Sequence, residues 1–156
     1  HEKVEKLISL CEWRHSIWLL GQNAPNPQKL PSRNDIDYWI QYNDEGVAVN
    51  LVKYVDFQPQ YLAGGISYGA VYTIGGGKRT IAVVDAIDGV KCWQKTQATV
   101  HIAFSIDNLR YCILKRKNFD AVICVRTQEL YDEFKEDGLD VRLLTGTPFE
   151  GFAINK

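Results

Sequence analysis

The stretch Asn118–Thr145 most constrains the fold, because it predicts a strand, a helix and a second strand in direct succession. Phe119–Val125 is a short apolar run of the kind that is buried on both faces of a sheet. Thr127 can cap the helix that follows, and Gly138 can end it. Leu139–Leu144 then supplies the second strand. This unit indicates an α/β protein, in which helices pack on a sheet.

Composition is ordinary for a single globular domain over residues 1–156, with 46% apolar and 24% charged residues. The formal net charge of −1 argues against a generally basic nucleic-acid binder. No apolar run approaches the roughly 20 residues of a membrane span, so no membrane partner is predicted. The chain contains no Met and begins at His1, which favours a processed product or a domain of a longer protein.

The four cysteines show no CxxC spacing, and three of them fall at apolar positions of predicted elements; they are Cys11, Cys92, Cys112 and Cys124. We interpret them as reduced core residues of an intracellular protein, and we therefore expect a cytoplasmic location.

The first part of the chain predicts one helix and two strands. Glu2–Leu20 has the spacing of an amphipathic helix, and the proline-rich stretch Gln22–Asp35 predicts a loop. Ile36–Phe57 predicts two strands around a turn at Asn43–Gly46. Gln58–Ser67 contains a proline and two adjacent glycines, so it is expected to be another loop.

From Tyr68 onward the pattern predicts a hairpin, further strands and a helix that packs on them. Ala70–Ile74 and Thr80–Ala86 are the expected hairpin strands, because Gly75-Gly76-Gly77 supplies a turn between them. The remaining expected elements are a turn at Asp88-Gly89, strands at Val90–Trp93 and Ala98–Ser105, a helix at Ile106–Lys117, and a closing edge strand at Phe152–Ile154. The expected architecture is a single mixed, mostly antiparallel sheet with helices packed on it.

Motifs for metal or nucleophilic catalysis are mostly missing from the sequence. Asp85 and Asp88 follow a strand and precede Lys91, as carboxylates do in some metal nucleases. The Glu-x-Lys expected on the next strand is missing, and turn formation explains the two aspartates. No metal site is predicted.

The run Phe134-Lys135-Glu136-Asp137-Gly138-Leu139 is similar to the Y-E-K-x-G-F run that ends the last helix in many acetyltransferases. With the order of elements after Tyr68, it makes the C-terminal half resemble the Gcn5-related N-acetyltransferase (GNAT) fold, which the acyl-homoserine-lactone synthases share. The resemblance implies acyl-CoA as cofactor, with phosphates held by Ser105, Asn108 and Arg110. It also implies Tyr131 as the proton donor to the leaving thiolate.

Two departures from that family leave open whether such an acyltransferase is active or degenerate. Ser105–Arg110 contains no glycine where the family's pyrophosphate loop has them, and Phe134 takes the place of the family's tyrosine. One alternative is a non-enzymatic module that binds a protein partner, favoured by an aromatic content that includes four tryptophans. The other is a nucleic-acid-binding domain with a local basic patch of Lys78, Arg79, Lys115, Arg116 and Lys117.

Overall fold

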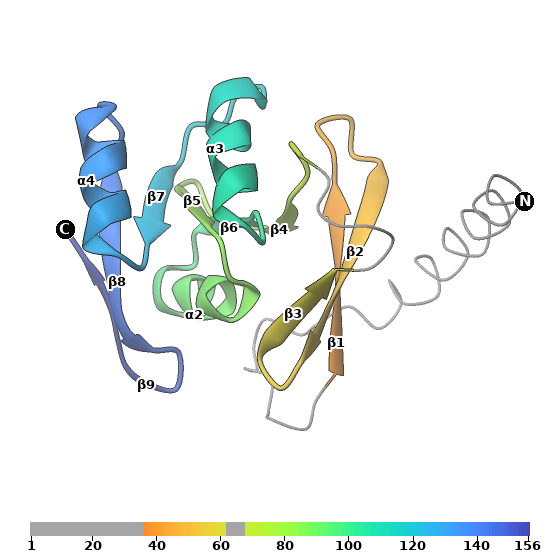
Figure 1. Cartoon of the computed structure of the whole chain (residues 1–156), viewed down its shortest axis with the longest axis horizontal. Coiled ribbons are helices and arrows are strands. Elements are labelled where there is room, and N and C mark those ends of the chain that lie inside the picture. Colours follow the sequence, from red (N-terminus) through yellow and green to blue (C-terminus); the bar gives the residue numbers. More distant parts are fainter. Residues whose placement is uncertain (1–35, 62–67) are drawn as a thin grey trace, which may run out of the picture.

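The computed structural model describes residues 36–61 and 68–156 (Figure 1). These residues form a three-stranded sheet, a six-stranded sheet and three helices, which confirms the mixed α/β class. The strands lie in two sheets and not in the single sheet expected, and the sheets meet at an isolated bridge between Tyr42 and Val71. The helix predicted at Glu2–Leu20 and the loop at Gln22–Asp35 lie outside the described residues.

The three-stranded sheet is an antiparallel meander of β1 (Ile36–Tyr42), β2 (Ala48–Val55) and β3 (Gln58–Tyr61). The predicted turn after β1 is confirmed. The side chain of Asn43 accepts hydrogen bonds there from the backbone N–H groups of Glu45 and Val47.

The loop expected from Gln58 onward is wrong for its first residues, which form strand β3. Asp56 and Phe57 adopt positive φ angles of 50° and 65°, so the chain reverses within two residues and pairs with β2 at once. Pro59 is compatible with this pairing because β3 lies at the edge of the sheet.

The six-stranded sheet has the order β4-β6-β5-β7-β8-β9, with the middle four strands parallel and both edge strands antiparallel. Its strands are β4 (Tyr72–Ile74), β5 (Thr80–Val83), β6 (Thr99–Ile102), β7 (Val122–Val125), β8 (Val141–Thr147) and β9 (Glu150–Asn155). The strands predicted within residues 98–105, 119–125, 139–144 and 152–154 are thereby confirmed.

The hairpin predicted between Ala70–Ile74 and Thr80–Ala86 is wrong, because β6 lies between β4 and β5 and pairs with both. The glycines after β4 allow two backbone segments to lie close together. A Cβ atom on Gly77 would lie 2.3 Å from the carbonyl oxygen of Gln97, just before β6. The hydroxyl of Thr99 also bonds to the carbonyl oxygen of Gly77 at 2.8 Å.

Helix α2 (Ala86–Thr96) replaces the turn expected at Asp88-Gly89 and the strand expected at Val90–Trp93. Asp85 begins it as the N-cap, with its carboxylate accepting from the N–H groups of Ile87 and Asp88. Gly89 lets this helix lie close to the sheet, because a Cβ atom there would be 2.7 Å from Cγ1 of Ile102.

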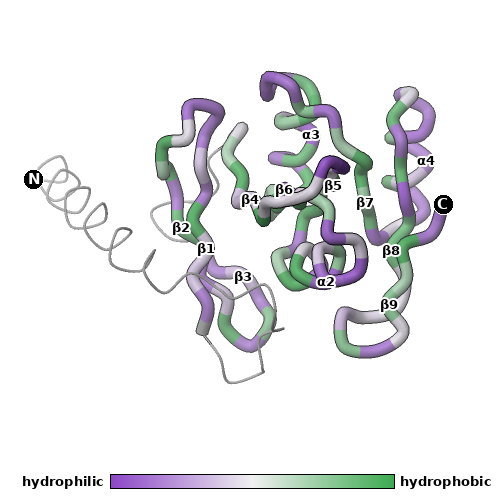
Figure 2. The backbone as a smooth tube through the Cα atoms, turned by 180° about the vertical axis from the view of Figure 1, so that it is seen from behind, coloured by the Kyte–Doolittle hydropathy of each residue, from purple (hydrophilic) through white to green (hydrophobic). Residues whose placement is uncertain are grey.

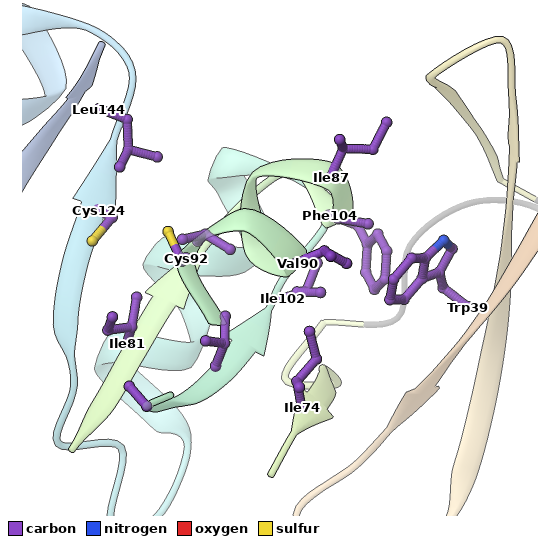
Figure 3. Close-up of a cluster of buried hydrophobic side chains, with 14 of the residues drawn as sticks. Trp39, Ile74, Ile81, Ile87, Val90, Cys92, Ile102, Phe104, Cys124 and Leu144 are labelled. Atoms are coloured by element: carbon purple, nitrogen blue, oxygen red, sulfur yellow. The ribbon is translucent and has the colours of Figure 1, made fainter. Parts of the chain in front are cut away.

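The helices cover both faces of the six-stranded sheet. Helix α2 packs with one core cluster, which includes Val100, Ile102 and Trp39 of the smaller sheet (Figure 3). Helices α3 (Ile106–Lys115) and α4 (Gln128–Glu136) pack with the cluster on the other face, around residues such as Ile123. Strand β7 appears hydrophobic along its length in Figure 2, while the turn between β1 and β2 is hydrophilic. None of the three described helices has the length and apolar character that a membrane crossing requires.

Candidate functional site

The parallel strands have a topological switch point at the carboxyl ends of β5 and β7. These strands are neighbours, but β5 leads into α2 on one face of the sheet and β7 leads into α4 on the other. The chain therefore diverges and leaves a crevice between the two connections, which is where ligands bind in open α/β sheets.

A cavity of about 180 Å³ lies at this switch point. Its walls are almost entirely apolar, and three charged residues lie at its border with little polar surface facing it. The lining residues are Val84, Asp85, Asp88, Ile106, Cys124, Val125, Arg126, Leu130 and Leu144. An apolar cavity with a few polar groups is the usual form of a small-molecule site.

Asp85 is held by three hydrogen bonds at the start of α2. Its Oδ2 accepts from the N–H groups of Ile87 and Asp88, both at 3.0 Å, and its Oδ1 accepts from the hydroxyl of Tyr54 at 3.0 Å. The same hydroxyl accepts from the N–H of Ala86. Burial raises the pKa of Asp85 above its ordinary value, and the adjacent charge of Asp88 raises it further. Tyr54 thus ties the smaller sheet to the site.

Asp88 and Arg126 form a two-point ion pair across the crevice. Nε of Arg126 donates to Oδ2 of Asp88 at 2.9 Å, and Nη2 donates to Oδ1 at 2.5 Å. Nη1 of Arg126 donates to the carbonyl of Gly146 in β8. The guanidinium carbon also lies 5.4 Å from the centre of the Phe152 ring in β9. One arginine therefore connects α2, β8 and β9 at the end of β7.

Two thiols from neighbouring elements lie near each other in the core, Cys92 from α2 and Cys124 from β7 (Figure 3). A hydrogen bond with Cys124, together with burial, raises the pKa of Cys92 far above its ordinary value. The raised pKa keeps the thiol of Cys92 protonated, which makes it a poor nucleophile. Cys92, Cys112 and Cys124 are all free and buried, which agrees with their interpretation as core residues.

The residues implied for an acyl-CoA phosphate site make contacts within the protein. Ser105 is the N-cap of α3, and its hydroxyl accepts from the N–H of Asn108 at 3.0 Å. Asn108 is fully buried, where its side chain accepts from the N–H of Gly69 and donates to the carbonyls of Ala70 and Ala103. Its hydrogen-bonding groups are therefore used to join the β6–α3 connection to the segment before β4.

The third predicted phosphate ligand, Arg110, and the predicted proton donor, Tyr131, lie on α3 and α4. Arg110 pairs with Glu133 through two bonds at 2.8 and 3.0 Å, which links the two helices. Tyr131 is half-buried, with the ammonium of Lys135 5.6 Å from its ring centre. None of the four predicted residues lines the switch-point cavity, although their neighbours Ile106 and Leu130 do. A role with acyl-CoA stays a prediction.

The residues of the predicted basic patch lie at the opposite, amino-terminal edge of the parallel strands. Lys78 and Arg79 precede β5, whereas Lys115 and Lys117 lie at the end of α3. Arg116 is engaged within the protein, since it pairs with Asp44 at 3.4 Å and donates to the carbonyl of Gly69 at 2.7 Å.

Arg126 is the member of the site that the sequence reasoning missed, and Asp85 and Asp88 were assigned to a turn. Their position in the sequence could have indicated the site, because Asp85 and Arg126 each come directly after a buried strand or within two residues of it. Within residues 36–61 and 68–156, no cluster of three or more His, Cys, Asp or Glu side chains is placed to hold a metal ion.

Comparisons with protein-family models, with curated proteins and with solved structures find no match to this chain.

Proposed function

We propose that the chain is a small-molecule-binding α/β domain whose ligand occupies the crevice at the carboxyl ends of β5 and β7. The observation that carries the proposal is the position of the cavity at the point where the connections to α2 and α4 diverge. In sheets of this kind, strand order alone creates a crevice there, and side chains from the two connections line it. The aliphatic walls match the mostly apolar lining of such sites.

The test is a screen of small ligands by amide chemical shifts in two-dimensional ¹H–¹⁵N spectra of the full chain. We expect hits to shift the amides of residues 84–88 and 124–130, which surround the cavity. Acetyl-CoA belongs in the same screen, because the resemblance to acyltransferases predicts that its phosphates shift residues 105–110.

A cavity-filling variant gives the screen its specificity. Leu130→Trp adds a large side chain at the cavity wall, whereas the matched control Leu114→Trp places the same group on α3, where Leu114 is 78% exposed. Ile106→Phe narrows the cavity from its other side and replaces Leu130→Trp if that variant does not fold. Hits that still bind to the cavity-filled variant, or that shift amides elsewhere, would contradict the proposal.

A further inference from the structure

The surface of the switch-point cavity is almost entirely apolar, although charged residues lie at its border. Its aliphatic lining comes from helices on one face of the sheet and from the ends of strands. The residues are Val84, Ile106, Val125, Leu130 and Leu144. A ligand in the cavity therefore meets hydrocarbon from several elements at once.

The polar groups at the border are bonded within the protein. Both carboxylate oxygens of Asp88 accept from Arg126, which also donates to the carbonyl of Gly146. Oδ1 of Asp85 accepts from the hydroxyl of Tyr54, and Oδ2 accepts from two backbone N–H groups. These bonds agree with the small polar surface that the charged residues show to the cavity.

Such walls favour an apolar ligand over both water and a polar ligand. A buried water typically makes about three hydrogen bonds to polar groups, and the cavity surface offers little for it to bond. An apolar group that displaces poorly held water gains affinity. A polar group would lose its bonds to bulk water on entry and find no partner in exchange, which is unfavourable.

The volume of the cavity limits the size of the ligand. A dry apolar cavity of about 150 Å³ holds one benzene molecule. The switch-point cavity, at about 180 Å³, therefore has room for one ring with a small alkyl substituent. We propose that the ligand is a hydrocarbon of this size, held by apolar contacts and without a hydrogen bond to the cavity wall. This inference rests on the proposed function and specifies the class of ligand.

Four probes test the ligand class on the full chain, namely toluene, phenol, benzoate and naphthalene. Each is titrated while the amide shifts of residues 84–88 and 124–130 are followed. We expect toluene to bind roughly tenfold more tightly than phenol, because the hydroxyl replaces a methyl group of similar size and is buried without a partner. Benzoate should bind more weakly than phenol because it carries a charge, and naphthalene more weakly than toluene because of its second ring.

Leu130→Ala tests the size limit, because it shortens a half-buried side chain of the cavity wall and adds no polar group. It should raise the affinity for naphthalene and preserve the preference for toluene over phenol. Leu114→Ala makes the same change on the exposed side of α3 and should alter neither. Circular dichroism checks the fold, and Ile106→Val is the milder enlargement if Leu130→Ala does not fold. An unchanged affinity for naphthalene in the folded variant would contradict the inference.

The outcomes separate this inference from the proposed function. If phenol or benzoate binds at the cavity as tightly as toluene, the ligand class is wrong and the cavity is still a binding site. The same conclusion holds if none of the four probes shifts the cavity amides but another compound of the screen does. If no compound shifts them, the inference and the proposed function both fail.

Discussion

Removing Arg126 should cost more stability than removing Asp88, although either change breaks the same ion pair. The side chain of Asp88 is only 9% exposed, whereas that of Arg126 is 35% exposed. Arg126→Gln therefore leaves a carboxylate that water can hardly reach. Asp88→Asn leaves a guanidinium that still reaches water and still donates to Gly146.

The burial of the two side chains sets the expected magnitudes. Loss of one partner from a fully buried pair costs about 3–5 kcal/mol, and an exposed pair contributes about 0–1 kcal/mol. Because Arg126 is partly exposed, we expect Arg126→Gln to lower the free energy of unfolding by about 2–3 kcal/mol. For Asp88→Asn we expect about 1 kcal/mol, the usual net value of a hydrogen bond. The double variant should cost less than the sum of the two, with a coupling energy of about 1–2 kcal/mol.

Urea unfolding followed by tryptophan fluorescence measures these differences, provided that the slope of free energy against urea is unchanged. Arg110 and Glu133 supply a matched control, because they also form a two-point pair but are each 40% exposed. Arg110→Gln and Glu133→Gln should each cost much less than Arg126→Gln, with no asymmetry between them. Equal losses of stability in Asp88→Asn and Arg126→Gln, or the same asymmetry in the control pair, would show that burial does not set these costs.

Three further changes test other contacts near the site. Tyr54→Phe removes the hydroxyl that bonds to Asp85 and to a backbone N–H of α2, so the free energy of unfolding should fall by about 1–3 kcal/mol; a loss below the error of urea titration would contradict this role. Asp85→Asn keeps an N-cap residue at the start of α2. Burial raises the pKa of Asp85 in the folded protein, so the free energy of unfolding of the wild type falls as the pH rises from the ordinary pKa of 3.8 through the raised one. The variant should therefore gain stability relative to wild type as the pH rises above about 4, and a stability difference that stays flat or falls would oppose this expectation. Gly146→Ala should lower stability by about 2–4 kcal/mol, because φ is +71° and the new Cβ would lie 2.0 Å from the carbonyl oxygen of Gly151. The control Gly138→Ala has open space around the new Cβ and should cost less when calorimetry compares the two variants.

Elements whose start, apolar residues and end are all marked by nearby residues were predictable from the sequence. Phe119–Val125 is apolar, Thr127 caps the next helix and Gly138 follows it, and all three features appear in the structure as expected. Such signals act within a few residues, so they need no knowledge of the rest of the chain.

Helix α2 was not predictable in the same way, because its start depends on distant contacts. Val90–Trp93 is too short for periodicity alone to assign it to a helix or a strand. Asp85 caps the helix, and the hydroxyl of Tyr54, 31 residues earlier in the chain, holds its carboxylate. The triple glycine before β5 gave a similar error, since glycines show where backbones can turn or approach but not which strand is the partner.

The candidate site depends on strand order, which no local pattern contains. Neighbouring strands lie about 4.8 Å apart, so side chains at the ends of β5 and β7 can meet only if these strands are adjacent. Had β6 entered between them, as the sequential order of the chain suggests, the two strands would be about 10 Å apart. The ion pair of Asp88 with Arg126 and the cavity beside it would then not form. The insertion of β5 between β6 and β7 therefore creates both the switch point and its charged group. Polar residues that directly follow buried strands become informative about function once this order is known.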